Sequence, residues 1–121
     1  MSGDASMADQ DDAVAVYVSE VGQIKPLAKD EEMQLFHQLS GTGDWDEARG
    51  NIARRLIEGH LLQVVRIAQK HSDLGAPMLD LIEEGNNGLL DAVKTFAERP
   101  IGDFADYAAT CIDEAIKKAF G

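Results

Sequence analysis

The sequence predicts an all-α protein with about five helices in one domain, and three observations support this prediction. Apolar side chains recur at three- and four-residue steps in several segments, as they do on the buried face of a helix. No stretch shows the sustained alternation of apolar and polar residues that marks a strand. Glycine and proline separate the periodic segments. The chain has 121 residues, which is enough for a single core.

The first two predicted helices lie on either side of Pro26. The first begins at Asp11 or Asp12, either of which can cap it, and ends near Gly22. Its apolar face consists of Val14, Tyr17, Val18 and Val21. The second has acidic residues at positions 30–32, which suit its positive N-terminal end. Its apolar positions are Met33, Phe36 and Leu39, and the glycine-containing segment 40–44 then breaks the pattern.

Three further helices complete the predicted fold. A long helix extends from Trp45 to His71, and Gly59-His60 is the point where it can bend. Gly75 and Pro77 mark the boundary before a fourth helix over residues 79–96, and the last helix covers 104–118. The predicted core consists of Leu56, Val64, Ile82, Leu89, Val93, Phe96, Ile112 and Ala115.

The first ten residues are polar and acidic and contain no apolar core, so they do not form a secretory signal. We expect a mobile, disordered acidic tail over residues 1–10, followed by one helical domain over residues 11–121. No run of 18 apolar residues predicts a membrane span. Cys111 is the only cysteine, which excludes an internal disulfide and suits a protein of the reducing cytoplasm.

The net charge of −11 opposes non-specific attraction to nucleic acid. The charge is unevenly distributed, because residues 1–48 contain 2 basic and 11 acidic side chains, whereas residues 49–121 contain 9 basic and 11 acidic ones. The second part is therefore close to neutral, with a net charge of −2. Even so, it does not have a basic surface.

The sequence contains no catalytic constellation, and we expect neither an enzyme nor a bound metal or cofactor. The three histidines, His37, His60 and His71, are far apart in sequence, and none stands at metal-binding spacing from a cysteine or a carboxylate. We interpret them as surface or half-buried residues. Gly41-Thr42-Gly43 lacks the third glycine and the lysine of a phosphate-binding loop.

The fourth predicted helix contains Gly85, Gly88, Asn86 and Asn87 in its interior. Each interior glycine costs about 1 kcal/mol relative to alanine, so a helix selected only for stability would not contain them. Two interpretations remain: the glycines allow a neighbouring helix to approach closely, or they leave a bare, polar surface for a partner. The acidic residues around them and the flanking segments favour a docking face.

The run from Leu79 to Phe96 is preceded by Leu56-Ile57-Glu58 and Val64-Val65 and is followed by Tyr107-Ala108 and Ala115-Ile116. Together these segments resemble region 2 of the bacterial sigma-70 family of transcription initiation factors, and the run from Leu79 to Phe96 carries most of the resemblance. The segment from Asp12 to Leu39 is similar to region 1.2 of the family. The resemblance implies a helical bundle that binds RNA polymerase and takes part in promoter opening.

The resemblance assigns a polymerase-binding role to the helix that contains the two glycines. In the family, this helix binds the clamp helices of the polymerase β′ subunit, which present basic side chains. The matching residues here are Asp80, Glu83, Glu84, Asn86 and Leu90. Glu83 stands where many members have glutamine, and Leu90 where many have methionine. Asn87 and Asp91 depart from the family, where an apolar residue and a lysine are common.

The last helix matches the family less well at positions that face DNA. Phe104 and Tyr107 are retained, although the spacing of Phe104 suits the core. The family's paired tryptophans are replaced by Thr110 and Cys111, and its basic and amide residues by Asp113 and Glu114. The candidate DNA-binding residues that remain are Arg99, Tyr107, Lys117 and Lys118. We therefore expect weak binding to single-stranded promoter DNA, because base stacking on an aromatic ring contributes about 1–3 kcal/mol per base.

Two functions are consistent with the sequence. The chain is either a divergent sigma factor module that docks on polymerase and contributes to recognition of the promoter −10 element, or a sigma-like decoy that binds polymerase or an anti-sigma factor without reading DNA. Family members continue into further DNA-binding helices, so the end of the sequence at Gly121 implies either a shortened chain or a stand-alone module.

Overall fold

A computed structural model of the chain describes residues 2–40 and 45–121, except for the side chains of residues 2–11. Its helices are α1 (Ser2–Gly22), α2 (Lys29–Leu39), α3 (Glu47–Glu58), α4 (Leu61–Lys70), the 3-10 turn η1 (Ser72–Leu74), α5 (Met78–Glu98) and α6 (Phe104–Phe120). The described ranges contain no strand, which confirms the all-α prediction. None of the described helices is long and apolar enough to cross a membrane. Helix α1 begins at Ser2, whereas the sequence predicted a start at Asp11 or Asp12. The mobility predicted for residues 1–10 stays a prediction, because Met1 and the side chains of residues 2–11 lie outside this description.

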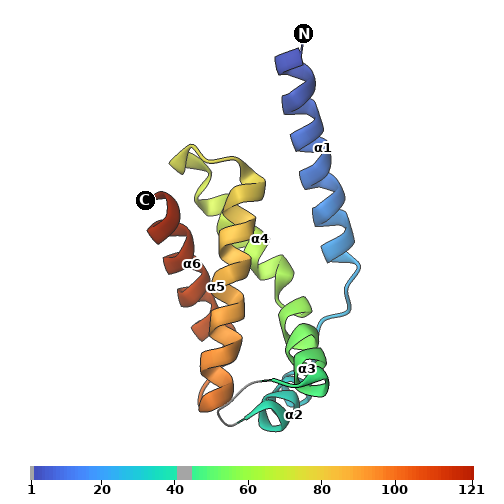
Figure 1. Ribbon diagram of the computed structural model, residues 1–121, viewed down its shortest axis with the longest axis vertical. Coiled ribbons are helices and arrows are strands. Elements are labelled where there is room, and N and C mark those ends of the chain that lie inside the picture. The colour runs from blue at the N-terminus through green and yellow to red at the C-terminus, as the bar shows by residue number, and fades with distance from the viewer. Residues whose placement is uncertain (1, 41–44) are drawn as a thin grey trace.

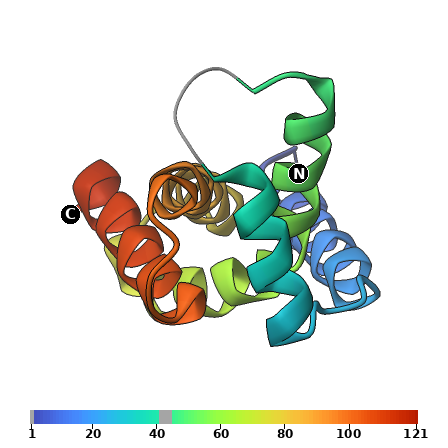
Figure 2. The same ribbon diagram turned by 90° about the horizontal axis from the view of Figure 1, so that it is seen from below.

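Helix α5 lies at the centre of the fold, and α6 runs antiparallel beside it (Figure 1). Helix α4 packs against both, while α2 and α3 pack against each other and against α5 at the end where the α5–α6 loop lies. Figure 2, seen from that end, shows α2 next to this loop. Helix α1 contacts α4 and α5 and extends beyond them. The arrangement leaves one long side of α5 open.

The core consists of apolar side chains from α2 to α6. Three phenylalanines join α2, α5 and α6, because the ring centroid of Phe36 lies 4.7 Å from those of both Phe96 and Phe104. Phe104 is 2% exposed, so its assignment to the core is confirmed. The predicted core residues are also buried, with one exception. Ala115 is only half-buried, because it lies at the edge of the contact between α5 and α6.

The single long helix predicted over residues 45–71 is wrong, and two helices, α3 and α4, take its place. Gly59 ends α3, and its backbone lies close to Leu27, since a Cβ at Gly59 would stand 3.4 Å from Leu27 Cδ1. The His60 side chain bonds to Glu32 of α2 and to Gln63 of α4. The chain therefore breaks at Gly59-His60, where the sequence indicated only a bend.

Candidate functional site

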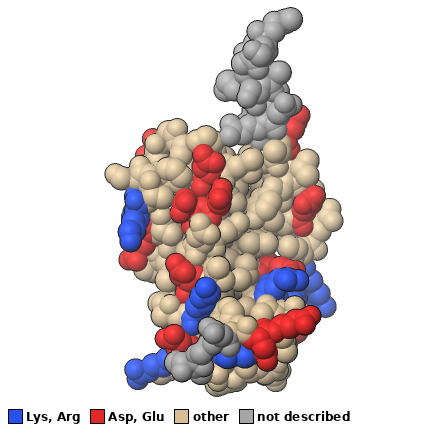
Figure 3. Space-filling view, in the orientation of Figure 1, with Lys and Arg blue, Asp and Glu red and all other residues tan. Residues whose placement is uncertain are grey.

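The acidic residues that were predicted to dock on polymerase lie at the outer face of α5. Asp80 and Glu83 are exposed, and Asn87 and Asp91 continue the same exposed stripe at three- and four-residue steps. Figure 3 shows acidic side chains gathered over the part of α5 nearer its N-terminus. Glu84 is half-buried. Asp80, Glu83 and Glu84 form no ion pair with any described residue, so no described basic side chain neutralises their charges.

The other two predicted docking residues lie away from the centre of this stripe. Leu90 is half-buried on the side of α5 that faces α3. Asn86 points to α1, where its Nδ2 donates a hydrogen bond to Tyr17 Oη at 3.3 Å. The Asn86 Oδ1 atom is buried and has no hydrogen-bond partner among the described residues. The structure thus brings Asp80, Glu83 and Glu84 together. Leu90 lies at the edge of this acidic group, and Asn86 contacts α1 instead.

Gly85 and Gly88 are buried, and they face neighbouring helices. A Cβ at Gly85 would stand 2.7 Å from Val64 Cγ1 of α4. A Cβ at Gly88 would stand 2.7 Å from the Cys111 carbonyl oxygen and 2.8 Å from Ala115 Cβ of α6. The glycines therefore permit close helix packing, and the interpretation that they expose a bare surface for a partner is wrong. A docking role for α5 has to rest on its acidic stripe.

The candidate DNA-binding residues lie on the α5–α6 loop and on α6. Arg99, Lys117 and Lys118 are exposed, and Tyr107 is 36% exposed. The Tyr107 ring packs on Phe96, with a centroid separation of 5.9 Å, and burial raises the pKa of its hydroxyl. Tyr107 and Lys117 are separated by about 15 Å along the helix at 1.5 Å per residue. The four residues therefore form two separate groups at opposite ends of α6.

Asp113 of α6 has two partners that reduce its effect on the surface charge. Its Oδ1 accepts from His71 Nε2 at 2.6 Å, and its Oδ2 lies 2.9 Å from Lys117 Nζ. Hydrogen bonds from Lys117 and His71 lower the pKa of the Asp113 carboxyl. Because Asp113 ties α6 to the end of α4, it is not a free acid on the predicted DNA-facing side of α6. Glu114 is exposed and has no ion-pair partner among the described residues.

Comparison with known proteins identifies the family of this chain. The family model for sigma-70 region 2 matches residues 56–120, from the last turn of α3 to the end of α6. The chain belongs to the sigma-70 region 2 family. It is 39% identical over 108 residues to the RNA polymerase sigma factor SigA of a Bacillus species. This match covers 89% of this chain and 27% of the Bacillus protein. The SigA of Lactococcus lactis subsp. cremoris is 37% identical over 109 residues. That match covers 90% of this chain and 29% of the relative, so the chain spans less than a third of either protein.

In this sigma-70 region 2 chain, the segment before the matched residues also packs onto the domain. Tyr17 of α1 contacts Asn86 of α5, and Glu32 of α2 bonds to His60. Sequence reasoning missed both contacts, because 69 residues separate Tyr17 from Asn86 and 28 residues separate Glu32 from His60. Sequence reasoning also missed the bond between His71 and Asp113, which are 42 residues apart. No signal in the sequence identifies these pairings.

His60 connects three parts of the domain. Its ring bonds to Glu32 of α2 and to Gln63 of α4, and it packs edge-on against Phe104 at a centroid distance of 4.8 Å. Gln63 Nε2 in turn donates to the carbonyl oxygen of Ala105 at 2.9 Å. Burial alone would lower the pKa of His60, but the hydrogen bonds with Glu32 and Gln63 and the nearby carboxylates raise it above 6.5.

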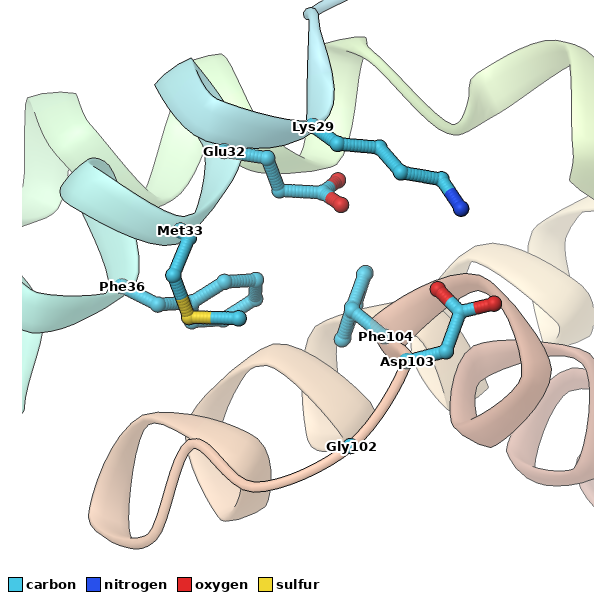
Figure 4. A pocket seen from close by; sticks show the side chains of 7 residues that line it. All are labelled: Lys29, Glu32, Met33, Phe36, Gly102, Asp103 and Phe104. Atoms are coloured by element: carbon cyan, nitrogen blue, oxygen red, sulfur yellow. The ribbon is translucent and has the colours of Figure 1, made fainter.

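A pocket of about 250 Å³ lies beside this junction, between α2 and the α5–α6 loop (Figure 4). The aromatic rings of Phe36 and Phe104 form part of its wall. Lys29 extends from α2 toward Asp103 of the loop, and Glu32 points into the space between the two segments. Gly102, in this loop, has a φ of 92°, a conformation that glycine adopts without strain. The pocket therefore has both charged and aromatic lining residues.

Proposed function

We propose that this chain is the part of a transcription initiation factor that docks on the clamp helices of the RNA polymerase β′ subunit and contributes to recognition of the promoter −10 element. Membership of the sigma-70 region 2 family supports this proposal, as does the similarity to two proteins named RNA polymerase sigma factor SigA. Promoter DNA and an anti-sigma factor are further proposed partners.

The observation that carries the docking proposal is the set of uncompensated carboxylates on α5. Asp80, Glu83 and Glu84 occupy the first two turns of the helix and form no ion pair with a described residue. A basic partner would supply the missing charge, and complementary charges both accelerate encounter and fix the register of a complex. Leu90 follows Glu83 by two helical turns and offers an apolar contact on the same side.

The docking proposal predicts that reversing charge on this stripe weakens clamp binding. We expect Glu83→Lys and Glu84→Lys to reduce the affinity for a β′ clamp-helix fragment by about tenfold or more, or 1.4 kcal/mol, because like charges then face each other. Glu83 is exposed, so this variant should fold normally. Calorimetric titration of the full chain with the fragment provides the measurement.

The matched control is Glu98→Lys on the same exposed stripe of α5. It makes the same change in net charge about 21 Å along the helix from Glu84, at 1.5 Å per residue. The new lysine stands near the negative C-terminal end of the helix, where it is favourable. Equal affinities for all three variants and the parent chain would contradict the docking assignment.

The second candidate function is a decoy that binds polymerase or an anti-sigma factor without reading DNA. The state of α6 favours this candidate, since Phe104 is buried, Tyr107 packs on Phe96, and Asp106 and Glu114 are exposed acids. Acidic side chains repel the phosphates that a DNA-binding surface must neutralise. The two candidates share the docking face and differ only at α6.

DNA binding separates the two candidates. We expect the parent chain to bind a labelled −10 single strand weakly, and Thr110→Trp with Glu114→Gln to improve binding by about 1–3 kcal/mol, one stacking contact. Both positions are exposed, whereas Cys111 is half-buried and Asp113 is tied to α4. Fluorescence anisotropy at two salt concentrations measures the effect. Tight, sequence-selective binding by the parent chain would instead favour the initiation module over the decoy.

A further inference from the structure

An unfilled groove lies between α3 and α5, next to the acidic stripe. Its volume is about 340 Å³, and its apolar walls are formed by Trp45, Ala53, Ile57 and Leu90. Burying an apolar side chain of a partner against these walls would be favourable, at about 25 cal/mol per Å² of apolar surface removed from water. The groove is therefore an attractive place for a partner residue.

Two cations border the groove. Arg54 of α3 and Lys94 of α5 are exposed and form no ion pair with a described residue. Glu58, which also lines the groove, is half-buried. The border of the groove is thus more basic than the stripe of Asp80, Glu83 and Glu84. A partner that covers both must present basic residues to the stripe and a carboxylate near Arg54 and Lys94.

The groove and the stripe form one continuous surface. Glu83 and Leu90 are seven residues apart, which places them on the same side of α5 about 10.5 Å apart along the axis. Lys94 follows Leu90 by one further turn on this side. A helix that runs along the outer face of α5 over Glu83 therefore passes over the mouth of the groove.

We propose that the groove receives one large apolar side chain from the same basic helical partner that docks on the acidic stripe. This inference rests on the proposed clamp-helix docking and adds its apolar anchor. The charged stripe then sets the orientation and rate of encounter, while the buried side chain supplies the contact that slows dissociation. Anchors of this kind, in desolvated pockets near the centre of an interface, contribute most of the binding energy.

Trp45 makes the proposal directly measurable. It is the only tryptophan of the chain, it lines the groove, and it is half-buried in the free protein. We expect a tryptophan-free β′ clamp-helix fragment to shift Trp45 emission to shorter wavelength. We also expect the fragment to reduce acrylamide quenching by about twofold, because a side chain in the groove removes water from the indole.

Gly50 provides a matched pair of variants. It lies in α3, lines the groove, and a Cβ at this position would have no heavy atom within 4 Å. We expect Gly50→Leu to fill the groove and weaken fragment binding by about tenfold, while Gly50→Ala leaves the affinity unchanged. Both should melt at or above the parent temperature, since each replaces a helical glycine with a better helix former.

The outcomes separate the groove from the stripe. Fragment binding that depends on Glu83, but leaves Trp45 emission unchanged and is equal in Gly50→Leu and Gly50→Ala, would overturn the groove proposal and retain the docking proposal. Absence of fragment binding to the parent chain would overturn both. The expected result is binding that is weakened by Glu83→Lys and by Gly50→Leu, but not by Glu98→Lys or Gly50→Ala.

Discussion

Helices α5 and α6 lie side by side and both carry several acids, yet their outer faces differ in what those acids do. On α5, Asp80, Glu83 and Glu84 have no ionic partner among the described residues. On α6, Asp113 is held by His71 and Lys117. The comparison shows that the number of acids on a helix does not determine its available charge. The availability depends on which neighbours the fold provides.

The inner faces of the two helices form the most extensive helix–helix contact among the described residues. Gly88 of α5 lies against the backbone of α6 at Cys111 and Ile112. The cysteine is half-buried beside this contact, and burial raises the pKa of its thiol. The distance between the helices is therefore fixed by the absence of a side chain at one position. Substitutions at this seam should have the largest effects on stability.

Gly88→Ala would disrupt the close packing between α5 and α6. The new Cβ would stand 2.7 Å from the Cys111 carbonyl oxygen and 3.1 Å from Ile112 Cα, and backbone atoms cannot move aside as a side chain can. We expect a loss of about 2–3 kcal/mol in the free energy of unfolding, in the upper part of the range for overpacked cores. Gly50→Ala, which has open space around its Cβ, should gain about 0.5–1 kcal/mol. Urea denaturation measures both, and equal midpoints for the two variants would show that the helices adjust freely.

Neutralising one acid on each helix sharpens the comparison of their outer faces. We expect Asp113→Asn to cost about 1 kcal/mol in unfolding free energy, because the tie from α6 to His71 and Lys117 is weakened. Glu83→Gln should change the stability by less than about 0.5 kcal/mol, as expected for a surface position without partners. If thermal denaturation shows the same change for both, the Asp113 contacts do not contribute to stability.

The smallest expected effect is the pH dependence that arises from His60. Its pKa in the folded state is raised above the ordinary value of 6.5, so protonation favours the folded chain. This contribution is fully present below the unfolded-state pKa and is lost as the pH rises through the folded-state pKa. We expect the parent chain to lose more stability than His60→Gln between about pH 6 and about pH 8, a range in which histidine titrates. Parallel urea midpoints for both proteins across this range would exclude a role for His60. The pKa of Asp113 is lowered from 3.8, so the stability that its ionised carboxylate contributes is lost only as the pH falls through its folded-state pKa.

The sequence predicted much of the fold because helices depend on local patterns. Apolar spacing located α5 and α6, and all of the predicted core residues except Ala115 are buried. The motif around Leu79 to Phe96 indicated the family that the comparison confirmed. The same local reasoning failed at Gly59-His60. At this break Gly59 lies beside Leu27 and His60 bonds to Glu32, and both partners belong to segments outside the helical pattern of residues 45–71.

The sequence by itself determined the helical class, the apolar faces and the acids of α5, since each follows from residues within a few turns of one another. The tertiary structure decided which acids of α5 and α6 stay unpaired, and it showed that Gly85 and Gly88 permit close helix packing. Asp113 meets His71 across 42 residues, and Asn86 meets Tyr17 across 69. No local pattern encodes such pairs, because they form only when packing of the core brings distant helices together. The same packing turned Gly85 and Gly88 inward and left the carboxylates of Asp80 and Glu83 in solvent.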